Sequence, residues 1–297
     1  MAHYLGIDIG GTKVAFRVET DAGCVDETTF PWAPRKSAAR DLAQLADHVA
    51  GLRTRLGAPL RSVGVAMPAT VGPDDRITAW PSRPEWTGLS LDASLRALFP
   101  QSAVAWADDG DLGALAEARA SGCDDLLYVG VGTGVGGGLV LNGAPCPGLG
   151  RGSFEIGHVV VELDGTFCVC GRQGCLQAIA SGPETLERAA LLRGEAVTFD
   201  DLRQALHREQ PWAMSAVDRT ARALAAAVTG VGELVHPERA VIGGGFAAGI
   251  PEIVGWVSEH LAVLARPGQP PLRAEPASLG GLSSLRGAVS LARLIAS

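Results

Sequence analysis

The 297-residue sequence lacks a surplus of positive charge, because 25 lysines and arginines stand against 32 aspartates and glutamates for a net charge of −7. This balance argues against a nucleic-acid-binding protein that relies on a basic surface. The sequence also lacks an apolar run long enough to span a bilayer, and it lacks the basic and then apolar N-terminal stretch of a secretory signal. We therefore expect a cytoplasmic protein with neither a membrane nor a nucleic acid as its partner.

The features of disordered, fibrous and repeat proteins are absent as well. Hydrophobic residues make up 47 % and charged residues 19 % of the chain, which is a globular composition. We find neither a low-complexity tract nor a repeat at solenoid spacing. The length is sufficient for two domains of ordinary size, each with its own core.

Short apolar strands alternate with amphipathic helices along the chain, which predicts an α/β protein. The strand-meander pattern occurs twice, so we expect two domains. We place the first at residues 1–118, with the C-terminal helix (285–297) packing back on it, and the second at 119–284. The expected strands are 4–9, 14–19, 24–30, 63–67, 103–107, 126–131, 137–141 and 239–242, and the expected helices are 38–56, 91–98, one that ends near 121, 211–235, one from 251 and the C-terminal one.

Glycines gather at the ends of three predicted strands. The three segments are Asp8-Ile9-Gly10-Gly11-Thr12-Lys13, Gly132-Thr133-Gly134-Val135-Gly136-Gly137-Gly138 and Gly243-Gly244-Gly245. The first joins two strands, so it is neither a Walker loop nor a dinucleotide fingerprint. Glycine lets backbone N–H groups approach a phosphate closely, and the second segment has more glycines than a hairpin needs. We interpret the three as phosphate-binding turns, with Asp8 able to hold Mg²⁺ through water; the alternatives are tight hairpins and, for the third, close packing at a helix start.

Three of the six cysteines lie within eight residues and follow a histidine. Cys168, Cys170 and Cys175, together with His158, form a Cys₃His set with glycines that bend the loop. Such a set matches a closed tetrahedral zinc site, whose role is structural because no coordination position stays open. This argues against a zinc hydrolase. The alternative is a group of buried free thiols.

Acidic residues cluster where a predicted strand gives way to a helix. Asp108, Asp109 and Asp111 occupy this junction, and Glu155 lies three residues before His158. A kinase that acts on an alcohol needs a carboxylate within hydrogen-bond reach of the hydroxyl group. We interpret the junction as the source of that base. The alternative is a capping role, since aspartate is common at helix N-termini.

These segments together resemble the ROK family of bacterial sugar kinases and sugar-responsive repressors, over nearly the whole chain and in the same order. The segment Glu155-x-Gly157-His158 resembles its sugar-binding motif, and Cys168-x-Cys170-Gly171-x-x-Gly174-Cys175 resembles its zinc signature. The resemblance implies the actin-like (ribonuclease H-like) two-domain ATPase fold, with a cleft between lobes that close around a sugar and ATP. Repressor members carry an extra N-terminal DNA-binding domain; the first turn begins at Asp8, so we expect an enzyme rather than a repressor.

The same resemblance assigns roles to single residues. Asp109 falls where the family has its catalytic base for the sugar 6-hydroxyl group, and Glu155 and His158 where it contacts hydroxyls near carbons 1 and 2. Three positions depart from the family. Asp108 replaces an asparagine that contacts the sugar near carbons 3 and 4, Gln177 replaces a sugar-contacting glutamate, and Ala69, after Pro68, replaces a glycine in the loop beneath the sugar.

The aspartate at position 108 suggests a particular substrate. An ionised carboxylate only accepts hydrogen bonds, whereas asparagine both donates and accepts. Opposite an ammonium group Asp108 would gain an ion pair, while opposite a hydroxyl it would leave a partly buried charge uncompensated. We therefore expect a hexose with an amine at or near carbon 3, as in kanosamine, phosphorylated at carbon 6.

Other interpretations stay open at this point. The sugar could be plain glucose or a C7 cyclitol, and polyphosphate could replace ATP as the donor. A sugar sensor without turnover is disfavoured, because a sensor needs no base at Asp109. We also expect a homodimer, as is common in the family.

Overall fold

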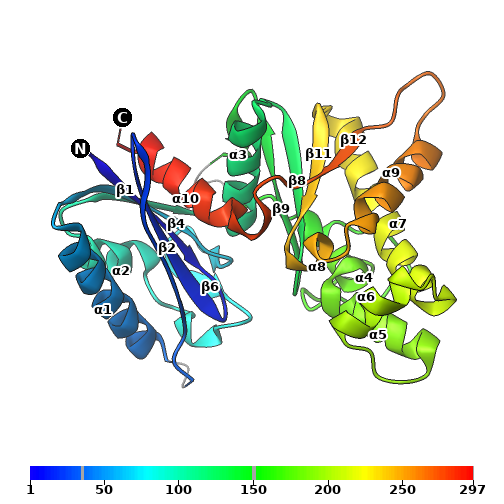
Figure 1. Ribbon diagram of the computed structural model, residues 1–297, viewed down its shortest axis with the longest axis horizontal. Coiled ribbons are helices and arrows are strands. Elements are labelled where there is room, and N and C mark those ends of the chain that lie inside the picture. Colours follow the sequence, from blue (N-terminus) through cyan, green and yellow to red (C-terminus); the bar gives the residue numbers. More distant parts are fainter. Residues whose placement is uncertain (35–36, 149–151, 297) are drawn as a thin grey trace. The chain divides into compact units, whose positions relative to one another are not determined.

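The computed structural model describes residues 1–34, 37–148 and 152–296 (Figure 1). The chain divides into two compact units. Unit 1 contains Met1–Ala116, the described residues of 147–153 and the C-terminal segment from Leu282, and unit 2 contains Glu117–Cys146 and Phe154–Gly281. The boundary between the two units falls inside helix α3 (Asp109–Ser121), and the boundary expected near residue 118 lies in the same helix. The described residues of 147–153 belong to unit 1, although we expected them in the second domain.

Unit 1 is built on a five-stranded sheet of order β3-β2-β1-β4-β7. Strands β1, β2 and β3 form an antiparallel meander, and β4 and β7 run parallel to β1. A two-stranded ribbon of β5 and β6 follows β4. The strand bounds are His3–Ile9 (β1), Lys13–Thr20 (β2), Gly23–Pro31 (β3), Leu60–Ala66 (β4), Thr70–Val71 (β5), Ile77–Ala79 (β6) and Ala103–Ala107 (β7).

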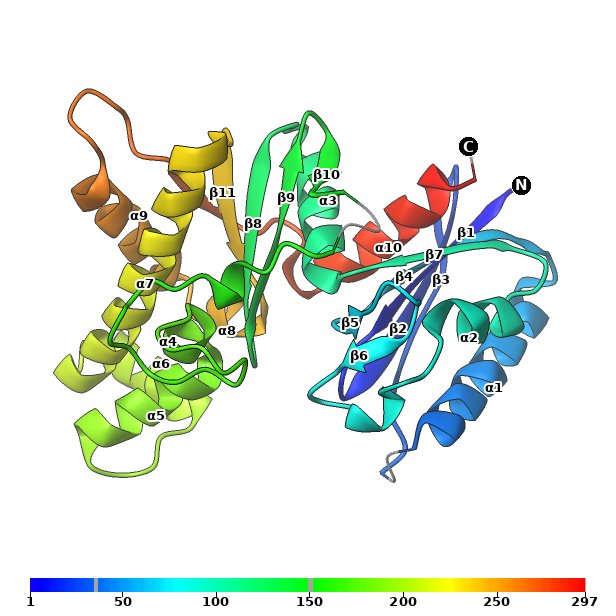
Figure 2. The ribbon, with the colours of Figure 1, turned by 180° about the vertical axis from the view of Figure 1, so that it is seen from behind.

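On one face of this sheet lie α1 (Ala38–Leu56) and α2 (Leu91–Leu98), as both ribbon views show (Figures 1 and 2). Helix α1 ends at Gly57, whose φ of 59° is the left-handed conformation in which helices commonly terminate. Its apolar residues recur at helical spacing and pack on alternate residues of β1. This core contains Leu45, Val49 and Leu52 of α1, Leu5, Ile7 and Ile9 of β1, and also Trp80 and Trp86. The two tryptophans anchor the loop that contains the 3₁₀ helix η1 (Pro84–Trp86).

The opposite face of the sheet is covered by the C-terminal helix α10 (Ser283–Leu294). Glycines make this possible, because the backbone of α10 lies directly on the strands. A Cβ atom at Gly64 of β4 would lie 2.8 Å from the backbone nitrogen of Ala292, and one at Gly6 of β1 would lie 2.7 Å from that of Val289. Strand glycines here therefore serve helix docking rather than a turn.

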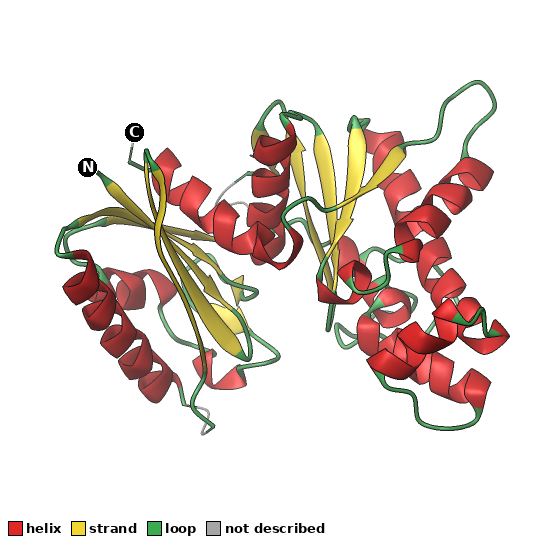
Figure 3. Cartoon of the chain, viewed as in Figure 1, coloured by secondary structure: helices red, strands yellow, loops and turns green. Residues whose placement is uncertain are grey.

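Unit 2 repeats the plan of unit 1. Its sheet has the order β10-β9-β8-β11-β12, with β8, β9 and β10 as an antiparallel meander and with β11 and β12 parallel to β8. Figure 3 shows a five-stranded sheet in each unit with helices packed on it. The bounds are Leu126–Val131 (β8), Val135–Leu141 (β9), Ala144–Cys146 (β10), Arg239–Gly243 (β11) and Arg273–Pro276 (β12).

The core of unit 2 lies between this sheet and a set of helices built around the 25-residue α7 (Pro211–Val235). Small residues dominate the buried side of α7, so neighbouring helices approach it closely. Among the described residues no helix combines the length and the apolarity needed to cross a membrane. The other bounds are Ile156–His158 (η2), Gln177–Ala180 (α4), Gly182–Arg193 (α5), Phe199–His207 (α6), Gly245–Ala248 (α8), Glu252–Leu264 (α9) and Gly280–Leu282 (η3).

Most of the expected helices and strands are present in the structure. Helices α1, α2 and α7 and strands β7 and β8 have the expected bounds. Strand β9 begins at Val135 rather than 137, so Gly136, Gly137 and Gly138 lie in a strand and not in a turn, which corrects the extent of the second glycine-rich turn. Helices α5 and α6 were not expected, although a capping box of Thr198 and Asp201 opens α6.

Candidate active site and metal centre

The parallel strands of unit 1 end side by side, and the expected sugar-site residues of this unit follow their ends. In the strand register Asp8 of β1 stands beside Ala66 of β4, and Ala66 stands beside Ala107 of β7. The N–H group of Met67 donates to the carbonyl oxygen of Ala107 at 3.1 Å, which keeps the two chains together beyond the sheet. Functional groups of α/β proteins commonly gather at this carboxyl edge. The residues that leave the edge next are Pro68, Ala69, Asp108 and Asp109.

Asp108 is the N-cap of helix α3. Its Oδ1 accepts a hydrogen bond from the N–H group of Gly110 at 2.9 Å, and its carbonyl oxygen accepts one from Leu112 at 3.1 Å. The capping interpretation is therefore correct for this residue. Asparagine would cap the helix as well as aspartate does, and the helix dipole adds a preference for the charged side chain.

Asp109 is the first residue of α3 and is half-buried, whereas Asp111 is only 7 % exposed. The positive end of the helix dipole favours the ionised form of a carboxyl group at this position. Asp109 thus has the exposure and the chemistry of a base, while Asp111 belongs to the interior of unit 1.

The first glycine turn, Gly10 to Thr12, has its three carbonyl oxygens held by the core of unit 1. Gly10 accepts from Trp32 Nε1 at 2.7 Å, Gly11 from Arg83 Nε at 3.2 Å, and Thr12 from the backbone N–H of Trp32 at 3.1 Å. Within the part of the chain that the structure describes, no group accepts a hydrogen bond from the N–H of Gly11 or Thr12. Two consecutive amides without a protein acceptor are what an anion-binding turn requires.

Neither glycine of this turn has a positive φ, so the conformational freedom of glycine is not the reason for its presence. Space is the reason at Gly11, where a Cβ atom would lie 2.6 Å from the Cβ of Ser82. Beside the turn, Ser284 Oγ donates to Asp8 Oδ2 at 2.7 Å. Burial raises the pKa of the Asp8 carboxyl, against the opposing effects of this hydrogen bond and of the charge on Lys13.

The second glycine turn, Gly132 to Gly134, occupies the equivalent place between β8 and β9 of unit 2. Gly132 accepts from the N–H of Gly182 at 2.9 Å and donates to the carbonyl of Gly134. The N–H groups of Thr133 and Gly134 have no acceptor among the described residues, and they correspond in the hairpin to those of Gly11 and Thr12. Each hairpin therefore has two consecutive amides that could bind a ligand.

The third glycine segment lies against the end of the same hairpin. Gly244 has a φ of 85°, and a Cβ atom there would lie 2.5 Å from the backbone nitrogen of Val131. The packing interpretation therefore explains Gly244 and also Gly243, which lies against Tyr128, whereas a Cβ at Gly245 would meet nothing within 4 Å. The segment stands at the carboxyl end of β11, where Gly243 pairs with Gly130 of β8.

The Glu155-x-Gly157-His158 motif forms the 3₁₀ helix η2, with Glu155 exposed at its N-terminus. Gly157 is required by packing, since a Cβ atom there would overlap the carbonyl group of Val135 and lie 2.9 Å from its carbon. The side chain of Gln177 also lies beside Gly157 and Val135. Its Oε1 accepts from the N–H of Val135 at 3.1 Å. The structure thus gives Gln177, expected as a sugar contact, a backbone partner at the end of the second turn.

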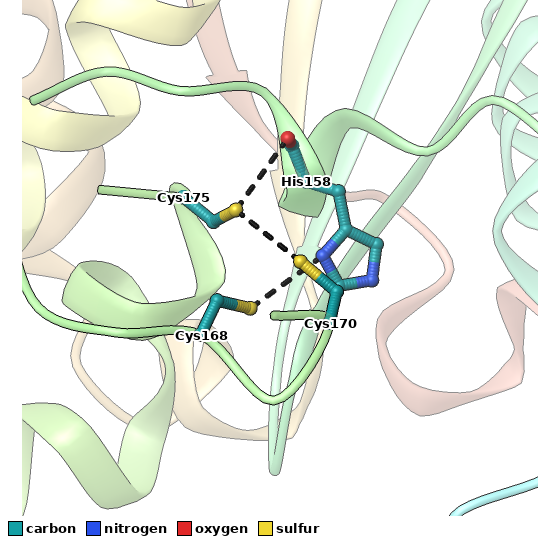
Figure 4. A group of neighbouring side chains, drawn as sticks. All are labelled: His158, Cys168, Cys170 and Cys175. Carbon is teal, nitrogen blue, oxygen red and sulfur yellow. Dashed lines mark hydrogen bonds between the residues drawn. The ribbon is translucent and has the colours of Figure 1, made fainter. Parts of the chain in front are cut away.

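Four metal-ligating groups converge in the loop of residues 158–175, called the metal loop below. The ligand atoms of His158, Cys168, Cys170 and Cys175 all lie within 4.8 Å of one another. Figure 4 shows the three sulfur atoms and Nδ1 of His158 turned toward a common centre, with Nε2 on the far side of the ring. The structure therefore brings together all four residues that the sequence analysis named.

The spacing of these atoms fits a tetrahedral zinc ion. Cys168 Sγ lies 3.7 Å from His158 Nδ1, and Cys170 Sγ lies 3.6 Å from Cys175 Sγ. Bonds of about 2.3 Å in a tetrahedron give sulfur–sulfur separations of about 3.8 Å. The donor set and its spacing could thus hold zinc with no large rearrangement.

The thiols differ in their readiness to ionise without a metal. Hydrogen bonding to the backbone of Arg172 lowers the pKa of the Cys170 thiol to about 6, and burial raises the pKa of the Cys175 thiol to about 12. A metal that binds both must therefore compensate the cost of ionising Cys175.

The sequence did not predict the side chains that donate hydrogen bonds to the carbonyl groups of the first turn and to Asp8. Trp32 and Arg83 come from different segments, and Ser284 comes from the C-terminal helix. No local motif surrounds any of them, so only the folded arrangement shows their contacts with the turn and with Asp8.

The chain is similar to known sugar kinases over most of its length. The kanosamine kinase of Amycolatopsis mediterranei (strain S699) is 69 % identical to this chain over 294 residues, which cover 99 % of this chain and 97 % of that protein. The glucokinase of Halalkalibacterium halodurans is 27 % identical over 289 residues, which cover 89 % of this chain and 86 % of that protein. The ROK hexokinase structure from Thermus thermophilus has a TM-score of 0.84 at 26 % identity, covering 99 % of this chain and 98 % of that one.

The structural similarity extends over the whole chain, which confirms the prediction of an actin-like α/β fold. The prediction of a sugar kinase is confirmed by the same relatives. The model of the ROK family matches residues 4–294. This chain belongs to the ROK family.

Proposed function

We propose that this sugar kinase transfers the γ-phosphoryl group of ATP to the 6-hydroxyl of kanosamine. The observation that carries the proposal is the 69 % identity to a kanosamine kinase, against 27 % to a glucokinase. A second support is the carboxylate of Asp108, which can form an ion pair with an ammonium group where asparagine could only hydrogen-bond to it.

Asp109 is the base in this proposal. Its carboxylate accepts the proton of the 6-hydroxyl group as the sugar oxygen attacks the γ-phosphorus and the bond to the leaving ADP oxygen breaks. The place of Asp109 in the first turn of α3 favours the ionised form of its carboxyl group. Its half-buried position leaves it accessible to a hydroxyl group.

The nucleotide phosphates are assigned to the glycine turns. The paired amides of Gly11 and Thr12, and those of Thr133 and Gly134, donate to phosphate oxygens. Lys13 adds a positive charge, and the segment 243–245 lets the backbone approach the nucleotide. Mg²⁺, when bound, supplies neutralisation of phosphate charge, and Asp8 would hold it through water. Gly136 lies in β9 with nothing within 4 Å of a Cβ atom, so it stays a candidate for close approach.

The sugar contacts in this proposal are those that the resemblance to the ROK family assigns. Asp108 pairs with the ammonium group at carbon 3, an attraction of roughly 4 kcal/mol at 4 Å and an effective dielectric of 20 before desolvation. Glu155 accepts from hydroxyls near carbons 1 and 2. If His158 held zinc through Nδ1, its ring would carry the proton on Nε2 and could donate it to the same hydroxyls. Pro68 and Ala69 line the sugar from below.

Zinc in the metal loop is structural in this proposal: it fixes the loop and the orientation of His158. The enzyme is placed in the cytoplasm, where ATP is available and thiol ligands stay reduced. We further propose a homodimer, which light scattering coupled to size-exclusion chromatography tests.

The first test is an ADP-release assay with ATP and Mg²⁺ on kanosamine, glucosamine, glucose, mannose and N-acetylated hexosamines. We expect kcat/KM for kanosamine at least tenfold above that for glucose, about 1.4 kcal/mol in transition-state stabilisation. A preference for glucose would contradict the assignment of the substrate and leave the kinase intact. Phosphorus–proton correlation in the NMR spectrum of the product identifies the phosphorylated carbon.

The role of the base has its own test. Asp109→Asn keeps the size of the side chain and removes its basicity. Turnover should fall by a factor of at least about 10³, while the Kd for kanosamine changes little. A variant with full activity would show that another group takes the proton.

A further inference from the structure

A buried polar network lies directly behind the first glycine turn. Arg83 is 3 % exposed and Asp41 is fully buried, and Arg83 Nη1 lies 2.7 Å from Asp41 Oδ2. Trp86 Nε1 donates to the same carboxylate oxygen at 2.8 Å. Asp41 lies in the first turn of α1, where the helix dipole also favours its negative charge.

This network reaches the turn through two donors. Arg83 Nε donates to the carbonyl of Gly11 at 3.2 Å, and Trp32 Nε1 donates to the carbonyl of Gly10 at 2.7 Å. The guanidinium group of Arg83 is stacked on the ring of Trp32, with its carbon 4.5 Å from the ring centroid. One stacked pair therefore holds two successive peptide groups of the turn.

The direction of a peptide group is fixed once its carbonyl oxygen is held. The carbonyls of Gly10 and Gly11 belong to the same peptide groups as the N–H of Gly11 and the N–H of Thr12. In a trans peptide the C=O and N–H bonds point in opposite directions. Because both carbonyls point to the core, both amides must point away from it.

The ion pair between Asp41 and Arg83 keeps the guanidinium group in this position. Asp41 neutralises Arg83 in the interior, so the guanidinium group is not free to leave for solvent or for the phosphates themselves. The planar guanidinium group of Arg83 donates through Nη1 to the carboxylate and through Nε to the turn at the same time. A lysine ammonium group could not reproduce this geometry.

We propose that Arg83 and Trp32 are positioning residues for nucleotide binding: with Asp41 as their anchor, they orient the amides of Gly11 and Thr12 toward the phosphates of ATP. This inference rests on the proposed role of the first glycine turn. Neither side chain touches the nucleotide; both act through the backbone of the turn.

Trp32→Phe is the most specific test of the proposal. It removes the N–H donor, keeps an aromatic ring against Arg83, and leaves the ion pair of Arg83 and Asp41 intact. We expect the KM for ATP to rise roughly fivefold, the factor for one lost hydrogen bond, with the KM for the sugar unchanged. Arg83→Lys, which keeps the charge opposite Asp41, should raise the KM for ATP roughly tenfold. Arg83→Ala is not suitable, since it leaves the Asp41 carboxylate buried and unpaired.

The matched control is Trp80→Phe. This indole is equally buried, at 2 % exposed, and its Nε1 has no hydrogen-bond partner among the described residues. The control loses the same ring volume without losing a bond to the turn. Its KM for ATP should equal that of the wild type, even if its Tm falls.

Each variant is assayed with the hexose that the wild type turns over best, and titrated with the ATP analogue AMPPNP in a calorimeter. The proposal is supported if Trp32→Phe and Arg83→Lys weaken AMPPNP and ATP selectively. It is overturned if their Tm falls as in the control but nucleotide affinity does not change, or if the KM values for sugar and ATP rise together. A wild type that prefers glucose would contradict the proposed substrate without affecting this comparison.

Discussion

Gly157→Ala is the substitution for which the structure gives the sharpest expectation. The added methyl group would overlap the carbonyl group of Val135, lying 2.9 Å from its carbon and 3.6 Å from the Cβ of Gln177. Ordinary carbon contacts are about 3.5 to 4.0 Å, so η2 must move away from β9 by a substantial part of an ångström or more. Glu155 and His158, on either side of Gly157, must move with it.

Three measurable losses follow from this displacement. Overpacking should lower the free energy of unfolding by about 1 to 3 kcal/mol. Misplacement of Glu155 and His158, the proposed sugar contacts, by about 1 Å should reduce kcat/KM for the sugar roughly 100-fold. Misorientation of the His158 ligand should weaken zinc binding by a factor of about 10 or more.

The assay combines steady-state kinetics at saturating ATP, zinc content by atomic emission and thermal unfolding. The control is Gly230→Ala, on an exposed part of α7 where a Cβ atom would meet nothing within 4 Å. That change should stabilise the protein by about 1 kcal/mol and leave kinetics and zinc content as they are. If Gly157→Ala kept wild-type kcat/KM and zinc content, the contact with β9 would not position the motif.

Three further outcomes are expected. Asp108→Asn should keep the helix cap yet reduce the preference for kanosamine over glucose by a factor of about ten or more, as measured by the ratio of kcat/KM values; an unchanged ratio would remove the argument for the ion pair. After a chelator has removed any bound metal, the rate at which iodoacetamide alkylates Cys170 should rise with pH with a midpoint near pH 6, because the lowered pKa of this thiol populates the thiolate above that pH. Mass spectrometry measures the alkylation, and a midpoint near pH 9 would contradict this expectation. Gly64→Ala should lower the free energy of unfolding by about 3 kcal/mol, because a methyl group there collides with α10; chemical denaturation that shows no loss would mean that the helix docks otherwise.

The sequence predicts those parts of the fold whose signals are local. The bounds of α1 and α7 follow from apolar residues at helical spacing together with a glycine after α1 and a proline at the start of α7. The Cys₃His set was recognisable for the same reason, since its ligands come from one short loop. The chemistry of zinc then requires that they converge.

Contacts between distant segments were not predictable. Arg83 and Asp41 are 42 positions apart, and Trp32 and Gly10 are 22 apart, so no local pattern relates them. The surplus of glycines after Thr133 was interpreted as turn, whereas Gly137 is set by crowding, with a Cβ atom 2.7 Å from Ile156. Steric demands of this kind arise only when the strands are assembled. The roles of the individual site residues stay predictions until the variants are measured.

The repeated sheet order described above has a consequence for how the molecule came to be. Two five-stranded sheets with the same sequence of antiparallel and parallel neighbours are what duplication and fusion of one ancestral coding segment would leave. Counted back from the ends of β1 and β8, Asp8 in the first hairpin corresponds to Gly130 in the second. One copy has kept or acquired a carboxylate where the other has only backbone. A carboxylate therefore precedes the first glycine turn but not the second, although the two sheets share one strand order.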